Sequence, residues 1–320
     1  ALYGLLTALA NGVEPRRDLS LVRPKGSRLK TFGGYSSGPE PLAELFDHVV
    51  ATFRAAQGRA LTTVEAFSIA TKIAQVVVVG GVRLSATIAL FDKDDTAMLN
   101  VKGPDAQMYS VDADGKWSEG PNAHYAMANV SAVFETTPTR EDFKVFWAAL
   151  KDGQRGEPGI FNREAMRKNA EAHGRSNYDE NGELIAWGAN PCCEIQLQPR
   201  QACNLTGVAI RDGDTLEQLK VKVELATILG TWQAAVTDFK YLRPEWKKNI
   251  ENEALLGTCL TGFYDHEVLS QDTPECEMWL RELRDHAIAV NKRYAPLLGI
   301  NAATSVTSVK PAGNSGELYD

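Results

Sequence analysis

The chain has 320 residues, of which 44% are hydrophobic and 23% are charged, and its formal net charge is −7. This composition is typical of a globular enzyme with a large core, and the negative charge argues against a nucleic-acid or anionic-membrane surface. The most apolar run, Ala74 to Val82, is too short to cross a bilayer, and the five cysteines have no regular spacing. We therefore expect a cytoplasmic protein that binds neither nucleic acid nor membrane, although one local anion site would suffice for a small phosphorylated ligand.

The first half of the chain predicts helices followed by short strands. Turn-forming residues over 14–41 argue against a long helix there. Apolar residues at helical spacing predict a helix over 42–56, and a second helix is expected to begin at Thr62 or Thr63 and to run to about Val79. The pattern then predicts strands over 86–91 and 129–134, with loops or a hairpin over 100–125.

The second half is richer in helical patterns. The pattern predicts helices over 139–150, 163–173, 215–237 and 276–296, and a last short strand over 306–309. Strands separated by helices indicate an α/β protein with a largely parallel sheet. Short strands among so many helices favour a closed barrel over an open sheet, and we treat residues 1–320 as a single domain.

The segment Asn190-Pro-Cys-Cys-Glu-Ile195 gathers three kinds of polar group. Gly188 and Pro191 break regular structure, so a tight loop is expected. Residues two apart share a face in an extended backbone, which places the amide of Asn190, the thiol of Cys192 and the carboxylate of Glu194 on one side and Cys193 on the other. An amide and a carboxylate can hold two neighbouring sugar hydroxyls, with the sulfur in reach of a ribose carbon. The alternative is that the cysteines are buried packing residues and Glu194 caps a neighbouring group.

This loop resembles the Asn-x-Cys-x-Glu active-site loop of ribonucleotide reductases, and its proline resembles the adenosylcobalamin-dependent class II enzymes in particular. Four further segments resemble the same family in the same order. They are Arg23-Pro-Lys-Gly-Ser-Arg-Leu-Lys-Thr-Phe-Gly-Gly34 with Ser37-Gly-Pro-Glu-Pro-Leu42, Gly81-Val-Arg-Leu-Ser-Ala86, Gly156-Glu-Pro-Gly-Ile-Phe161 and Lys310-Pro-Ala-Gly-Asn-Ser315. The resemblance reaches from about residue 20 to the end of the chain.

The resemblance implies a ten-stranded α/β barrel with the cysteine loop as a finger through its centre. Cys192 would become a thiyl radical that abstracts the 3′-hydrogen of a ribonucleotide, Glu194 would accept the 3′-hydroxyl proton, and Asn190 would bond the substrate hydroxyls. A carboxylate beside the ribose suits the loss of water from the 2′-carbon, because that step needs acid–base help. The product would be a 2′-deoxyribonucleotide for DNA synthesis.

The resemblance also implies roles outside the loop. Cys203 has the spacing of one of the family's two reducing cysteines, whose disulfide a thioredoxin-like dithiol would renew. The turn Ala312, Gly313, Asn314 and Ser315 resembles the family's phosphate-binding loop, although as a pattern alone it is a common turn. Adenosylcobalamin is the implied cofactor and a ribonucleoside di- or triphosphate the implied substrate. Residues 122–129 have the position of a family loop that links substrate choice to an effector nucleotide.

Other readings remain open at this stage. Adjacent cysteines without a nearby histidine make a poor zinc site, so we expect no metal bound directly by these residues. Gly81 and Arg83 fit either barrel packing or a phosphate contact, and Cys259 and Cys276 are interpreted as packing residues. The histidines 48, 124, 173 and 266 are scattered, and we interpret them as surface or core residues.

The resemblance is incomplete. The family's other reducing cysteine lies upstream of the Arg23–Gly34 segment, and no cysteine precedes Cys192 here. We therefore expect this chain to be a core segment of a longer or split protein that lacks the first and last barrel strands. The alternatives are a class I large subunit that uses a separate radical-generating subunit, and a non-catalytic nucleotide-binding relative.

Overall fold

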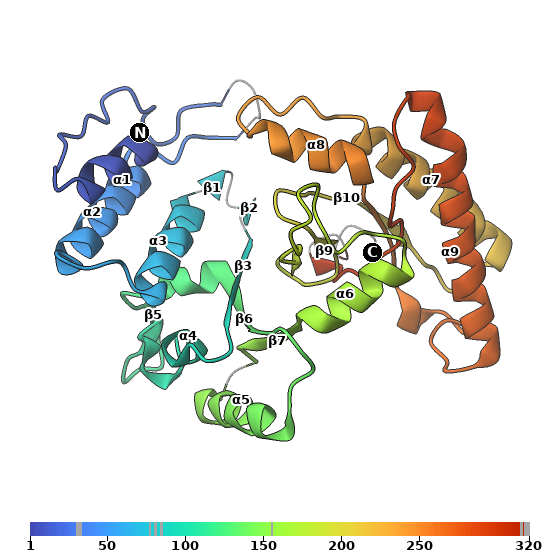
Figure 1. The fold of residues 1–320 in the computed structure, drawn as a ribbon, viewed down its shortest axis with the longest axis horizontal. Helices are drawn as coiled ribbons and strands as arrows, with labels where there is room; N and C mark the ends of the chain where they lie inside the picture. The colour runs from blue at the N-terminus through green and yellow to red at the C-terminus, as the bar shows by residue number, and fades with distance from the viewer. Residues whose placement is uncertain are drawn as a thin grey trace. The chain divides into compact units, whose positions relative to one another are not determined.

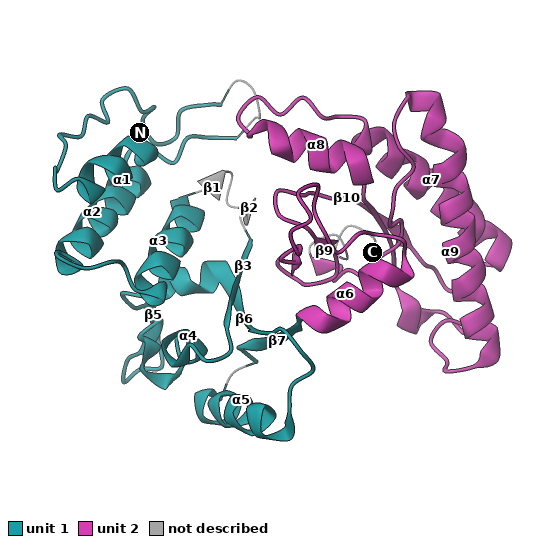
Figure 2. Ribbon diagram, in the orientation of Figure 1, with its two compact units in different colours: residues 1–162 teal, residues 163–320 magenta. Residues whose placement is uncertain are grey.

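The computed structural model describes residues 1–29, 34–76, 78–79, 82–83, 86–154, 156–313 and 316. The chain forms two compact units, residues 1–162 and residues 163–320 (Figure 2). Each unit is described by itself below, and the single domain expected over 1–320 stays a prediction.

The first unit combines helices with short strands (Figure 1). Its helices are α1 (Leu2–Ala10), α2 (Glu40–Ala55), α3 (Thr63–Val76), α4 (Thr96–Leu99) and α5 (Arg140–Gly153), with 3-10 turns η1 (Pro104–Ala106) and η2 (Ala123–Met127). Its strands are β1 (Val78–Val79), β2 (Val82–Arg83), β3 (Thr87–Asp92), β4 (Tyr109–Val111), β5 (Trp117–Glu119), β6 (Ala128–Phe134) and β7 (Gly159–Asn162).

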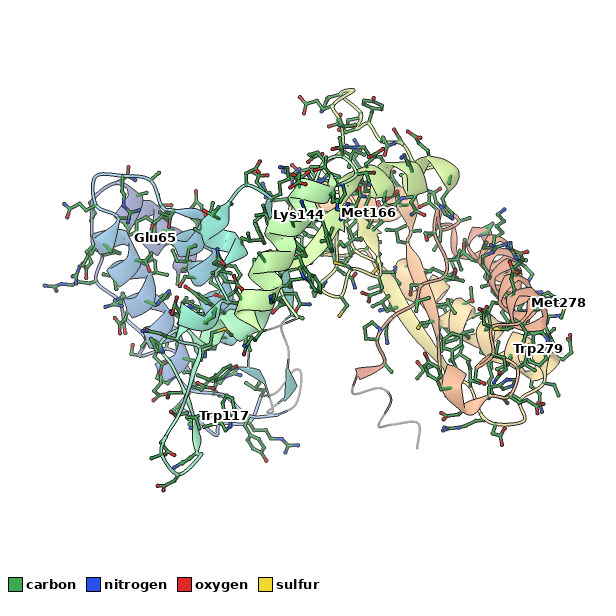
Figure 3. The ribbon with its side chains drawn as sticks, turned by 90° about the horizontal axis from the view of Figure 1, so that it is seen from below. Glu65, Trp117, Lys144, Met166, Met278 and Trp279 are labelled. Carbon is green, nitrogen blue, oxygen red and sulfur yellow. The ribbon has the colours of Figure 1, made fainter. Side chains whose placement is uncertain are left out.

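A three-stranded parallel sheet, in the order β3-β6-β7, forms the centre of the first unit. Strand β6 is buried almost throughout, and Phe67 of α3 and Phe146 of α5 belong to the core cluster around it. A second cluster joins α1, α2 and α3. The β4–β5 hairpin, with Trp117 exposed (Figure 3), confirms the hairpin expected within 100–125.

The Gly156–Phe161 segment fixes the edge of this sheet. The Glu157 carboxylate accepts hydrogen bonds from Lys102 Nζ at 2.6 Å and from the Val130 backbone at 2.9 Å. A Cβ added to Gly159 would lie 2.6 Å from Ser131 Oγ, so a larger residue here would require the Ser131 hydroxyl to move. The motif therefore has a structural role in this unit: it anchors the start of β6 and packs β7 beside it.

Two of the scattered histidines meet at one buried serine. Ser68 Oγ lies 2.9 Å from Nε2 of His124 and 3.0 Å from Nε2 of His48. Burial lowers the pKa of His124 to about 4, and the positive charges of His48 and Lys72 add to this shift. Burial, followed by the charge of Lys72, also lowers the pKa of His48. These interactions join α2 and α3 to η2, so both histidines are partnered: His124 is buried in the core and His48 is half-buried beside it.

The lowered pKa of His124 predicts that stability falls in mild acid. Between pH 6.5 and about 4, the imidazole of His124 binds a proton in the unfolded chain but not in the folded one. The contribution of His124 to the free energy of unfolding is therefore fully present above pH 6.5. It declines as the pH falls towards 4, by up to about 1.4 kcal/mol per pH unit. Unfolding midpoints measured across this range should decline less steeply in His124→Gln than in the wild type. Parallel curves for the two proteins would contradict the prediction.

The second unit contains the cysteine loop and the longest helices. Its helices are α6 (Arg163–Ala172), α7 (Leu216–Ala234), α8 (Pro244–Glu253) and α9 (Pro274–Tyr294), with 3-10 turns η3 (Phe263–Asp265) and η4 (Pro296–Leu298). Its strands are β8 (Gly188–Ala189), β9 (Gln196–Leu197), β10 (Asn204–Ala209) and β11 (Leu256–Thr261).

Strands β10 and β11 form a parallel pair, with Asn204 opposite Leu256, and a parallel bridge joins Thr258 to Thr307. Helices α7 and α9 lie side by side (Figure 1), and Leu219, Leu283 and Val208 belong to the core that these helices form with the strands. Among the described residues, the segment expected as a strand over 306–309 forms this isolated bridge and is not a strand. The expected α/β class with parallel strands is confirmed.

None of the described helices combines the length and the apolar composition that a membrane crossing requires.

Candidate active-site loop

The Asn190–Ile195 segment is a tight hairpin loop, as predicted. Strand β8 pairs antiparallel with β9, with Ala189 opposite Gln196. Across the loop, the backbone N–H of Cys193 donates to the Asn190 carbonyl at 2.9 Å, and the Ile195 N–H donates to Asn190 Oδ1 at 3.0 Å. The side chain of Asn190 therefore closes the loop through its oxygen.

The two cysteines of this loop are both exposed. Cys193 has a φ of +63°, in the left-handed region that side chains rarely adopt. This residue turns the chain, so the strict alternation of faces expected from an extended backbone does not hold at Cys193. A thiol at Cys192 is consequently presented near the tip of a turn that the Asn190 hydrogen bonds hold closed.

Glu194 has an unusual environment for a carboxylate. Among the described residues, its Oε2 atom is buried and has no hydrogen-bond partner. A cavity of about 650 Å³ is lined by Glu194 and Cys193, together with Met166 (labelled in Figure 3), Lys292 and Thr304. Cys192 is not part of this lining. A buried acceptor left without a donor is energetically costly, which indicates a site for a hydrogen-bond donor such as a hydroxyl.

Cys203 directly precedes β10 and lies close enough to the loop to respond to its charge. Burial raises the pKa of the Cys203 thiol to about 11, and the negative charge of Glu194 adds to the increase. The thiol is therefore protonated at neutral pH. Cys203 is a free thiol in this structure, as are the other four cysteines. The charge of Glu194 thus acts on the Cys203 thiol, and the role of both residues in a single site stays a prediction.

Gly257, which the sequence analysis did not single out, makes room for the loop. A Cβ at this position of β11 would lie 2.4 Å from Leu205 Cδ2 and 3.1 Å from Ile195 Cδ1. The absence of a side chain lets the base of the cysteine loop and β10 both pack against β11. A glycine within an apolar run was the only available signal for this close approach.

The predicted phosphate loop is described only in part. Ala312 and Gly313 follow the segment that bridges β11, and Gly313 has a φ of +51°, as in a turn. Asn314 and Ser315 lie outside the described residues, as do Gly81 and the side chain of Arg83. The phosphate-binding role stays a prediction.

Several other expectations concern metals and packing. Within the described ranges, no group of three or more His, Cys, Asp or Glu side chains is arranged to hold a metal ion. Cys259 and Cys276 are 1% and 8% exposed, which confirms that they are packing residues. The stretch expected to resemble an effector loop forms η2, in which Ala123, His124 and Tyr125 are buried.

Comparison with known proteins confirms the sequence resemblance. No family model matches the chain. The adenosylcobalamin-dependent ribonucleoside-triphosphate reductases of Lacticaseibacillus paracasei and Lactobacillus acidophilus are 27% and 28% identical to it, over 94% of this chain and 41% of each relative. A crystal structure of a B12-dependent class II ribonucleotide reductase matches with a TM-score of 0.67 and 22% identity, over 94% of this chain and 42% of that one. The chain therefore spans about two fifths of the length of these relatives and shares its fold with the solved one.

Proposed function

We propose that this chain, a relative of the adenosylcobalamin-dependent ribonucleotide reductases, carries the substrate-reducing cysteine loop of such an enzyme. The observation that supports this most directly is the loop itself: an exposed Cys192 thiol stands two residues from a carboxylate whose buried Oε2 lacks a donor. We propose further that the parallel strands of both units belong to the ten-stranded α/β barrel of this family, within one catalytic domain over 1–320.

In the proposed reaction, a thiyl radical on Cys192 abstracts the 3′-hydrogen of the ribonucleotide. Glu194 accepts the 3′-hydroxyl proton, which gives its buried oxygen the donor that it lacks in the structure. Asn190 holds the substrate hydroxyls; because its Oδ1 is already bonded to the loop, its Nδ2 group is the one that donates. Water then leaves the 2′-carbon.

Two thiols supply the two electrons for the reduction and become a disulfide. Cys203 is proposed as one of them, and its high pKa keeps it as a neutral hydrogen donor until the radical forms. A dithiol of the thioredoxin type would restore it by thiol–disulfide exchange.

Adenosylcobalamin supplies the radical-initiating chemistry when it is bound. This cofactor carries its own cobalt, so the protein need not provide a set of metal ligands, and the exposed Cys192 thiol fits the requirement for an accessible hydrogen donor. The described residues do not by themselves outline a surface for the corrin ring.

The remaining partners follow from the same relationship. By analogy with the relatives, the substrate is a ribonucleoside triphosphate, with its phosphates at the turn formed by Ala312, Gly313, Asn314 and Ser315. An effector nucleotide is proposed to act through residues 122–129. The cytoplasmic location stays a prediction.

The test is nucleotide reduction by the whole protein with adenosylcobalamin and a dithiol, on ribonucleoside tri- and diphosphates in parallel. We expect deoxynucleotide from the triphosphate without any second protein, and none without the cofactor. Activity that needs a separate radical-generating subunit would instead favour class I. No product under either condition would favour a non-catalytic nucleotide-binding relative.

A further inference from the structure

We propose that Arg175 and Glu253 form a buried clamp that positions the Asn190–Glu194 loop by holding the chain on both sides of it. The proposal deepens the proposed function, on which its catalytic consequence rests. Neither residue belongs to any motif that carries the family resemblance, and neither lies in the loop.

The ion pair at the centre of the clamp is bidentate and buried. Arg175 Nε lies 2.7 Å from Glu253 Oε1, and Nη2 lies 2.9 Å from Oε2. The two side chains are 3% and 13% exposed. The planar guanidinium matches a carboxylate through two parallel bonds, so this pair fixes orientation as well as distance.

The same guanidinium contacts strand β9 and the residue that directly precedes β8. Its Nη1 donates to the backbone carbonyl of Gln196, the first residue of β9, at 3.1 Å. Its Cζ lies 4.6 Å from the ring centroid of Trp187, which directly precedes β8. Trp187 is itself 1% exposed, and its indole N–H donates to Asn177 Oδ1 at 2.8 Å. One side chain thus contacts the chain on both sides of the loop.

Glu253 extends the clamp along the chain that leads to Cys203. Its Oε2 accepts hydrogen bonds from Gln198 Nε2 at 3.1 Å and from Gln201 Nε2 at 2.7 Å. Gln201 also donates to the Asn249 carbonyl at 2.8 Å, which ties the same segment to α8. The segment between the loop and Cys203 is therefore held at two points by the end of one helix.

A buried ion pair is a poor way to gain stability, because desolvation offsets much of its attraction. Its directional bonds do, however, specify one arrangement of the groups that it joins. Here those groups are the two ends of a loop whose thiol and carboxylate must both reach one ribose. A displacement of about 1 Å at a reacting group can lower a rate about 100-fold.

The experiment uses the whole protein and compares Glu253→Gln with the wild type. The amide keeps the shape of the side chain but removes the charge and one acceptor. We expect kcat for nucleotide reduction to fall about 10- to 100-fold with KM within about twofold, while a cooperative thermal transition persists. Glu251→Gln, an exposed carboxylate on the same helix, is the matched control and should retain wild-type kcat.

A second readout does not depend on activity. Limited alkylation followed by peptide mass spectrometry gives the ratio of labelling at Cys192 to that at Cys193. In Glu253→Gln this ratio should move toward that of the urea-unfolded chain, because the loop is released, and in the control it should not move. If Glu253→Gln does not fold, Gln201→Met, which removes one bond to the carboxylate, should shift the ratio in the same direction by a smaller amount.

Lower thermal stability with an unchanged labelling ratio and unchanged kcat would show that the pair only stabilises the fold, and would overturn the proposal. Absence of nucleotide reduction in the wild type would instead contradict the proposed function. The labelling ratio would still decide whether the clamp positions the loop.

Discussion

Replacing Cys192 by serine is expected to abolish deoxynucleotide formation, with a loss of at least about a thousand-fold. The hydroxyl has nearly the shape of the thiol, but its O–H bond is too strong to yield a radical that carries the reaction. Since Cys192 is exposed, the substitution should leave the fold unchanged. The measurement is product formation by the whole protein with cofactor and dithiol, alongside the thermal unfolding midpoint.

Cys193→Ser is the matched control for this result. Cys193 is the adjacent residue and is also exposed, so its serine variant tests whether any change of a cysteine in this loop lowers the activity. It should keep most of the activity. Product formed at the wild-type rate by Cys192→Ser would mean that the reactive thiol lies elsewhere in the protein.

Glu194→Gln is expected to lower kcat by about 100- to 10,000-fold, the usual contribution of a positioned general base. The amide can still accept a hydrogen bond from a substrate hydroxyl, so KM should change little. Glu183→Gln, an exposed carboxylate in the preceding loop, is the control and should retain wild-type kinetics.

The same substitution has a consequence that can be measured without turnover. Removing the negative charge of Glu194 should lower the pKa of Cys203 from about 11, although burial, the larger cause, keeps it above the ordinary value. A larger fraction of thiolate at a given pH should make Cys203 alkylate faster in Glu194→Gln, with a rate profile shifted toward lower pH. An unshifted profile would mean that the two side chains do not interact as described.

The cysteine loop could be predicted from the sequence because all of its determinants are consecutive. Gly188, Pro191 and the polar residues between them specify a turn and its chemistry together. The helices α2, α3, α7 and α9 were predicted close to their observed bounds for the same local reason, because apolar residues recur at helical spacing within each segment. The capping interaction at Thr62 is also confirmed: its Oγ1 accepts from the Glu65 N–H at 3.2 Å.

Two paired strands and two helices were missed by the sequence analysis. Strands β10 and β11 each contain a glycine and lack a long β-branched run, so their pairing, rather than their composition, makes them strands. Helix α8 begins with a proline at its first position and is rich in charged and polar residues, with Ile250 as its buried residue, so it offers few apolar positions from which a helix could be predicted. Helix α1 was missed as well, since the sequence analysis predicted no element over residues 2–10.

The polar contacts that shape each unit were beyond sequence reasoning for a similar reason. His48 and His124 carry no local sign that both will meet Ser68. Arg175 and Glu253 stand outside every recognised motif, and only the folded chain brings them together. Spacing along the sequence reveals residues that act within one turn or one helix face, whereas these pairs depend on how the elements pack.

The two residues of the clamp are added to the chain at different times during synthesis. Arg175 and Glu253 are 78 positions apart, with Arg175 made before the cysteine loop and Glu253 well after it. At about 5 to 20 residues per second, a ribosome adds the second partner about 4 to 16 s after the first. The nascent loop therefore leaves the ribosome before its final anchor exists, and its thiols pass through a period in which chaperones or cellular oxidants can reach them in an unorganised loop.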